Sequence, residues 1–350
     1  MNKKDLMFVI AVLKGERILC EPDWFSVLGF LQYHRIGGLF YNCAKRLGIC
    51  LPTKINKALL DIYQFQARRT EYIRQHLTEL SQVLIDEKVA HVLLKGSVLS
   101  NLTDEALIYT DGERVSNDID ILVKPDGISA VSNVLKRLGY IQGTYNAEQN
   151  AITPFSRMEI LKRRMNRGET APFLRLTGIP EFPFMEVDIN FSLGNIPGGY
   201  QDLLTAMIEE RIIYQGKIEL SITNEELFFL HLIMHQFKES NLYFMVERGK
   251  DLDLYKLADI YYLWREDIFD KGIFNCLVEK YKVQKEVGAV LGQVGRIFDD
   301  ESLRYAANQY GDLTPEIIDY NNKRTYIWTV DEKKRLCKSN ASSYLKEVSK

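Results

Sequence analysis

The sequence is poor in cysteine and has no long apolar run. Its 350 residues include five cysteines, an odd number, and none of them forms a Cys-x-x-Cys pair. This usage is typical of reduced thiols in a cytoplasmic protein, rather than of a disulfide framework or a zinc site. No segment approaches the roughly twenty apolar residues that a membrane-spanning helix needs, and the short apolar stretch at residues 6–13 has no convincing signal-peptide cleavage site after it. We therefore expect a cytoplasmic location and no membrane partner.

The chain also has no large excess of positive or negative charge. Lys and Arg number 45 against 47 Asp and Glu, which gives a formal net charge of −2. Acids and bases are interleaved, and this disfavours extended electrostatic binding to DNA or RNA. The hydrophobic content of 46% is enough for a substantial core in a chain of this length. We therefore expect a folded protein of two or three units, with nucleic acid a disfavoured partner.

Two carboxylates occur two residues apart in a segment with the pattern of a strand, at residues 118–123. Successive side chains of a strand point to opposite faces, so Asp118 and Asp120 share one face while Ile119 and Ile121 line the other. Carboxylates this close raise each other's pKa unless a positive charge lies between them. Magnesium supplies such a charge, since it prefers oxygen ligands and is commonly bound together with substrate phosphates.

A second strand pattern supplies a third acid. Glu186, Asp188 and Asn190 alternate with apolar residues, as in a half-buried strand. If this strand pairs beside the first, three acids converge.

A short buried strand is also predicted at residues 92–94, before a turn that begins at Gly96 and Ser97. Such a strand-to-helix turn presents backbone N–H groups and a hydroxyl, an arrangement that binds phosphate, and Lys95 adds a cation. By itself, either an Asp-x-Asp pair or a Gly-Ser turn is common in ordinary structure. Their occurrence in order with Asp188 favours a metal site used for nucleotidyl transfer.

These motifs resemble those of the DNA polymerase β-like nucleotidyltransferase superfamily, which has Gly-Ser after one strand, Asp-x-Asp on the next and a later single Asp. Within it, residues 95–97, 114–123 and 187–190 are similar to an uncharacterised bacterial nucleotidyltransferase family. The flanking segments around residues 24–35 and 248–264 are similar to that family as well. The resemblance covers most of the chain.

The resemblance implies two Mg²⁺ ions, with Mn²⁺ as an alternative, bound by Asp118, Asp120 and Asp188 as the catalytic residues. It also implies that Gly96 and Ser97 hold the β- and γ-phosphates of ATP or another nucleoside triphosphate. Further nucleotide-binding residues are predicted on both sides of these motifs: Lys95, Arg114, Ser116, Lys256 and Asp259. For the last two, three apart on one helix face, the alternative is an ordinary surface ion pair.

Three functions are compatible with this pattern. The leading one is a magnesium-dependent enzyme that moves a nucleoside monophosphate from a triphosphate to a hydroxyl of a small molecule or a protein, with release of pyrophosphate. The second is a catalytically silent regulatory protein that keeps the fold and binds nucleotide. The third is transfer to an RNA end, which the mild acidic balance disfavours.

The predicted fold class is α+β, with a small mixed nucleotidyltransferase sheet flanked by helices and with helical N-terminal and C-terminal regions. Residues 1–90 are expected to be helical, and residues 91–222 form the nucleotidyltransferase core, with a helix predicted at 127–138 and a strand from Tyr140. Residues 223–314 are expected to form a C-terminal helical domain. Residues 315–350 are more polar and are expected to form a tail in which residues 326–328 dock.

Overall fold

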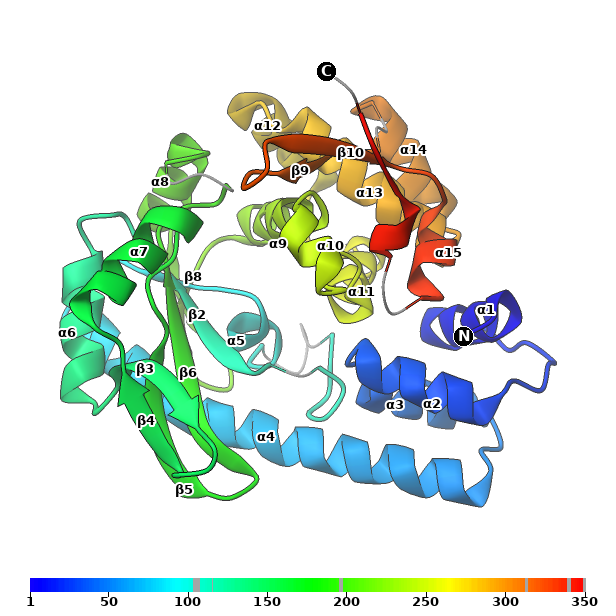
Figure 1. The fold of residues 1–350 in the computed structure, drawn as a ribbon, viewed down its shortest axis with the longest axis horizontal. Coiled ribbons are helices and arrows are strands. Elements are labelled where there is room, and N and C mark those ends of the chain that lie inside the picture. Colours follow the sequence, from blue (N-terminus) through cyan, green and yellow to red (C-terminus); the bar gives the residue numbers. More distant parts are fainter. Residues whose placement is uncertain (103–107, 115, 195–197, 312–313, 339–340, 349–350) are drawn as a thin grey trace. The chain divides into compact units, whose positions relative to one another are not determined.

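The computed structural model describes residues 1–350 except 103–107, 115, 195–197, 312–313, 339–340 and 349–350, and except the side chains of residues 166 and 167. The described chain is mixed α and β, with a mixed sheet flanked by helices, so the predicted fold class is confirmed (Figure 1). It divides into two compact units: unit 1 contains residues 1–66 and 229–350, and unit 2 contains residues 67–228. The four domains expected from the sequence, with their three boundaries, stay a prediction.

Unit 2 is built on a six-stranded sheet with the order β1-β2-β6-β5-β3-β4. Strands β2 and β6 run parallel, and the other neighbouring pairs are antiparallel. The elements of this unit are α4 (Thr53–Asp86) from residue 67 onward, β1 (Val92–Leu93), α5 (Gly96–Leu99), β2 (Asp118–Leu122), α6 (Ile128–Arg137), β3 (Ile141–Asn146), β4 (Ala151–Pro154), α7 (Arg157–Arg167), β5 (Phe173–Ile179), β6 (Phe182–Asn190), α8 (Gln201–Glu209), β7 (Ile212–Gln215) and β8 (Glu219–Ile222). The predicted strands at residues 92–94 and 118–123 and the predicted helix at 127–138 are therefore present.

The central strands alternate as their sequences predict. Ile119, Val187 and Ile189 are fully buried, whereas Asp118 and Asp188 on the alternate positions remain partly exposed. Parallel pairing sets Asp118 opposite Glu186 and Asp120 opposite Asp188. Because residues paired across strands lie on one face, this register collects the acids of β2 and β6 on the same side of the sheet.

Helices α6 and α7 have different sequence determinants. The buried residues of α6 recur with helical spacing at Ile128, Val131, Val134 and Leu135, which gives one apolar face. Helix α7 is mostly polar and begins with a capping box, in which the Ser156 and Glu159 side chains satisfy each other's backbone N–H groups. Gly168 then ends α7 in the left-handed conformation and leads the chain into β5.

Unit 1 is mainly helical. Its helices are α1 (Lys3–Lys14), α2 (Trp24–Tyr33), α3 (Gly37–Arg46), the first part of α4 (Thr53–Asp86), α9 (Glu225–Ser240, of which residues from 229 belong here), α10 (Tyr243–Glu247), α11 (Leu254–Arg265), α12 (Lys271–Tyr281), α13 (Gln284–Phe298) and α14 (Glu301–Gln309). Helix α13 contacts α1, α11, α12 and α14, so this helix forms the centre of the packing. The predicted return to helical structure after residue 223 is therefore observed.

The segment after Pro315, for which we expected a polar tail, contains regular structure. Strands β9 (Ile317–Asp319), β10 (Arg324–Trp328) and β11 (Leu345–Glu347) form a three-stranded antiparallel sheet, and α15 (Glu332–Leu336) lies between β10 and β11 in the sequence. Arg335 and Leu336 of α15 are buried, and the Arg335 guanidinium lies 3.9 Å from the ring centre of Trp328. Residues 326–328, which we expected to dock, are thus held by the strand pairing of β10 and by the contact between Trp328 and Arg335.

No helix in the described part of the chain is both long enough and apolar enough to cross a membrane.

Candidate functional site

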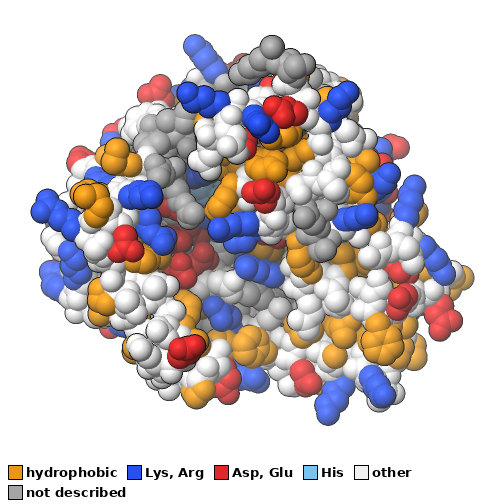
Figure 2. Space-filling view, in the orientation of Figure 1, with side chains coloured by type: hydrophobic (Ala, Val, Ile, Leu, Met, Phe, Trp, Pro, Cys, Tyr) orange, Lys and Arg blue, Asp and Glu red, His pale blue; other side chains and the backbone are white. Residues whose placement is uncertain are grey.

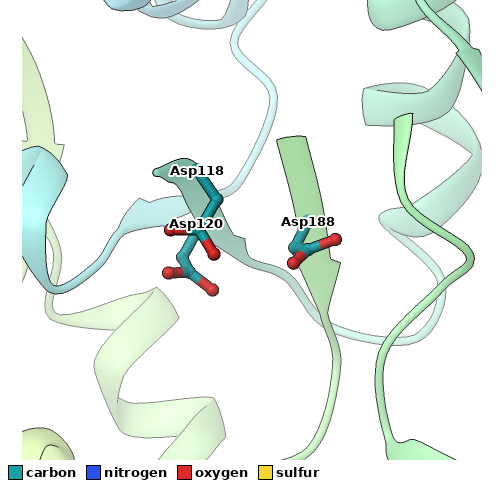
Figure 3. Close-up of side chains that lie close together, drawn as sticks. All are labelled: Asp118, Asp120 and Asp188. Carbon is teal, nitrogen blue, oxygen red and sulfur yellow. The ribbon is translucent and has the colours of Figure 1, made fainter. Parts of the chain in front are cut away.

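Three aspartates converge where β2 and β6 lie side by side in unit 2. Asp118 and Asp120 come from β2 and Asp188 comes from β6 (Figure 3). Each offers one carboxylate oxygen, and these three oxygens all lie within 4.8 Å of one another. The sequence predicted this convergence on condition that the two strands pair, and the register Asp120 to Asp188 supplies that pairing.

The turn between β1 and α5 is packed closely against the chain that leads into β2. A Cβ atom placed on Gly96 would lie 2.6 Å from Oγ of Ser116 and 3.3 Å from Nη1 of Arg114. Only glycine fits there without displacing a neighbour. Ser116 is in turn fixed by its hydroxyl, which donates to the carbonyl oxygen of Asp118 at 2.9 Å. The structure therefore brings Gly96, Arg114 and Ser116 together beside the first aspartate.

Ser97 carries a buried hydroxyl that has no hydrogen-bond partner among the described residues. The residue is 1% exposed, and its Oγ is fully enclosed. The backbone N–H groups of Ser97 and Val98 donate within the turn, to Leu94 and Lys95. The hydroxyl, rather than these two N–H groups, is thus the donor left for a phosphate oxygen. A buried polar group is costly unless it is paired, so the orphaned hydroxyl fits a site that a ligand completes.

Lys95 places a cation directly on the acidic cluster. Its Nζ lies 2.9 Å from Oδ1 of Asp120, which also accepts a hydrogen bond from the Asn190 side chain at 3.2 Å. The Lys95 backbone has φ 52° and ψ −125°, a conformation that non-glycine residues seldom adopt. Strained backbone of this kind persists only where the surrounding structure enforces it, here between β1 and the short helix α5.

Burial and charge repulsion both act on the acid face. Burial, and then the neighbouring Asp120 and Asp118, raise the pKa of Asp188 well above its usual value. Burial, and then Asp118 and Asp120, raise the pKa of Glu186 to about 7. Glu169 adds to both shifts, because its backbone pairs with Asn190 at the end of β6. The face therefore carries more negative charge than the Lys95 ammonium group balances.

This donor set fits a divalent cation. Mg²⁺ bonds oxygen at 2.0–2.1 Å, so two ligands of one ion lie at most roughly 4.2 Å apart, and two ions in a shared site lie roughly 3.5–4 Å apart. Three carboxylate oxygens within 4.8 Å of one another need only small side-chain adjustments to reach either arrangement. A bound cation would also favour the ionised form of Asp188, whose pKa is raised by burial and then by the neighbouring Asp120 and Asp118. Both the geometry and the electrostatics of Asp118, Asp120 and Asp188 therefore suit a metal site.

Two predicted nucleotide-binding residues belong to the other unit. Both lie on α11 of unit 1, where Asp259 is buried and the Lys256 side chain is 11% exposed. The Lys256 ammonium group pairs with Glu239 and lies 3.1 Å from Asp253. Lys256 therefore takes part in a largely buried ion-pair cluster with Glu239 and Asp253. A role for these two residues in nucleotide binding stays a prediction.

Several residues of the site were not among those predicted from the sequence. Glu186 and Asn190 flank Asp188 in the strand pattern, and their alternation with Val187 and Ile189 was the available signal. Glu169 and Arg69 gave no signal. Arg69, on α4, donates to the carbonyl oxygens of Ser116 and Asn117 at 3.1 and 3.3 Å, so it holds the segment that leads into β2.

A family model described as "Uncharacterised nucleotidyltransferase" matches residues 21–299 of the chain. The chain belongs to this family. The match spans the Gly-Ser turn and all three aspartates, and it confirms the resemblance drawn from the motifs. No curated protein and no solved structure matches the chain. Membership of a nucleotidyltransferase family supports a general activity of nucleotidyl transfer and implies a nucleoside triphosphate as substrate.

Proposed function

We propose that this nucleotidyltransferase is a magnesium-dependent enzyme that transfers a nucleoside monophosphate from a triphosphate, such as ATP, to a hydroxyl of a small molecule or a protein. The observation that carries the proposal is the meeting of three carboxylate oxygens from two strands within 4.8 Å. Mn²⁺ is an alternative ion. A cytoplasmic location accompanies the proposal as an expectation.

In the proposed reaction the acceptor oxygen bonds to the α-phosphorus, the bond between the α-phosphorus and the bridging oxygen breaks, and pyrophosphate leaves with that oxygen. Asp118, Asp120 and Asp188 would hold two divalent ions, which stabilise the charge that develops on the entering and leaving oxygens. The acceptor proton passes to solvent or to a neighbouring base. Catalysis of this kind depends mainly on positioning and on charge stabilisation.

The chain's own residues supply the positioning. The buried Ser97 hydroxyl donates to a phosphate oxygen, and Gly96 keeps the turn close enough to the Asp118 segment for that contact. Lys95, two residues before Ser97, neutralises Asp120 and adds positive charge beside the phosphates. Arg114, buried next to Gly96, adds a second cation on the same side of the turn. Together these groups would hold the triphosphate with its α-phosphorus at the acids.

The test is incubation of the protein with labelled nucleoside triphosphates, Mg²⁺ and a cell extract, followed by mass analysis of whatever gains a nucleotide. Pyrophosphate release is measured in parallel. We expect labelling with the wild type and with Asp126→Asn, which alters an exposed acid outside the site, and none with Asp118→Ala or Asp120→Ala.

Two results would replace the proposal by its alternatives. Stabilisation of the protein by triphosphate and Mg²⁺ without any pyrophosphate release would indicate a silent nucleotide-binding protein. Labelling of RNA, with retention that falls steeply as salt is added, would indicate transfer to an RNA end.

A further inference from the structure

A polar pocket that is open to solvent lies in unit 2, between α6 and α7. Its volume is about 190 Å³, and it is lined by hydroxyl, amide and cationic side chains from both helices. The polar residues that matter most are Ser129, Ser132, Asn133 and Lys136 on α6, Arg164 on α7 and Thr170 after it. Figure 2 shows several Lys and Arg side chains on the surface where Figure 1 shows these two helices.

The cavity carries positive charge without a compensating acid. None of its described lining residues is acidic, and Lys136 and Arg164 have no carboxylate within ion-pair distance among the residues that the structure describes. Arg137, the next residue on α6, differs in this respect because it pairs with Glu87. The guanidinium of Arg164 lies 5.7 Å from the ring centre of Phe191, a contact that leaves its N–H donors available.

This cavity is separate from the acidic cluster, because it lies on the other face of the sheet. Gln142, which lines the cavity, pairs with Phe173, and Phe173 pairs with Val187. Residues paired across strands share a face, and Val187 and Asp188 are adjacent, so their side chains point to opposite faces. A ligand between α6 and α7 therefore does not contact Asp188.

The chemistry of the lining selects a compact anion. Two cations, two serine hydroxyls and an asparagine amide line the pocket and offer hydrogen-bond donors to an anion. The Ser129 end of the cavity is the first turn of α6, where the helix dipole favours negative charge. The volume of about 190 Å³ is below the roughly 300 Å³ of typical drug-sized sites. A phosphate group fits within this volume.

We propose that the cavity between α6 and α7 is a binding site for a phosphate dianion, supplied either as free phosphate or as the phosphomonoester of a small metabolite. The site also has a direct connection to the acid face. The Thr170 backbone N–H donates to the carbonyl oxygen of Ile189 at 2.9 Å, and Gly168 accepts from Phe191 at 2.8 Å. Residues 168–170 therefore tie the cavity wall to the strand that carries Asp188.

The test is calorimetric titration of the full-length protein with inorganic phosphate, in EDTA so that no divalent ion can bring phosphate to the acids. We expect binding by the wild type and a loss of affinity of at least tenfold in the double variant Lys136→Gln/Arg164→Gln. Arg164→Lys, which keeps the charge, should retain most of the affinity. Arg137→Gln and Arg157→Gln, on the same two helices but outside the cavity lining, should bind as the wild type does.

A parallel titration with ribose 5-phosphate separates the two sources. Binding of both ligands assigns a phosphomonoester site, and binding of inorganic phosphate alone assigns a site for the free ion. Either outcome supports the proposal if the double variant loses that binding. Absence of binding, or equal affinity in the double variant and the wild type, would overturn it. Loss of binding in Lys95→Met instead would place the phosphate at the Gly-Ser turn and would also overturn it.

Discussion

Glu186 should make the metal-free protein less stable as the pH rises. Burial and the nearby Asp118 and Asp120 raise its pKa to about 7, from the ordinary value of 4.5. Between these two values the native state binds more protons than the unfolded chain, so the free energy of unfolding falls as the pH increases through this interval. The difference of 2.5 pKa units corresponds to about 3 kcal/mol at pH 8, at 1.36 kcal/mol per unit.

Replacement of Glu186 by Gln removes the carboxyl group that must ionise, at nearly constant shape. In EDTA at pH 8, Glu186→Gln should unfold at a higher temperature than the wild type, by up to roughly 6–12 °C, since 1 kcal/mol shifts Tm by roughly 2–4 °C in a unit of this size. At pH 5 the difference should largely vanish. Added Mg²⁺ should shrink it at pH 8, because a bound cation offsets the same repulsion.

The assay is thermal unfolding of both proteins at pH 5 and pH 8, with and without Mg²⁺. Glu148→Gln, in the exposed turn between β3 and β4, is the matched control and should not change Tm at either pH. A Tm for Glu186→Gln equal to or below that of the wild type at pH 8 in EDTA would refute the reasoning. A gain of the same size at pH 5 would refute it as well.

Three further predictions concern the turn and the acids. Gly96→Ala should lower stability by about 1–3 kcal/mol through overpacking against Ser116, whereas Gly29→Ala, with no atom within 4 Å of the new Cβ, should not; urea unfolding of both variants checks this. Asp118→Asn should reduce pyrophosphate release at least roughly 10²-fold without lowering Tm in EDTA, and a rate near that of the wild type would remove Asp118 from the catalytic site. Lys95→Met should weaken triphosphate binding by roughly 10- to 100-fold in calorimetry, the expected loss of one charge-assisted hydrogen bond, and unchanged affinity would exclude Lys95 as a phosphate ligand.

The sequence was sufficient to predict the elements that carry the acids. Alternation of apolar and acidic residues is a local signal, and it identified β2 and β6 together with the face on which Asp118, Asp120 and Asp188 lie. The short strand before Gly96 and the helix α6 were predicted on the same local basis. The three acids can converge only if their two strands are neighbours. The register of β2 with β6 confirms that these strands pair.

Contacts between distant parts of the sequence were beyond such local signals. Arg69 reaches the segment before β2 from the middle of a long helix, and Glu169 reaches the acid face because the chain after α7 pairs with the end of β6. The local sequence around Arg69 or Glu169 does not differ from that around an ordinary solvent-exposed charged residue. Strand β11, in the polar C-terminal segment, forms by pairing with β10. Polar sequences give little periodicity from which to predict such pairing.

The central claim is that the acids of β2 and β6 bind divalent ions together with a nucleoside triphosphate. Titration with Mn²⁺, followed by electron paramagnetic resonance in the presence of a non-hydrolysable triphosphate, tests it most directly. The account predicts two bound ions per chain in the wild type, and loss of at least one of them in both Asp118→Asn and Asp188→Asn. Binding that is absent, or that is unchanged in these two variants, would contradict it.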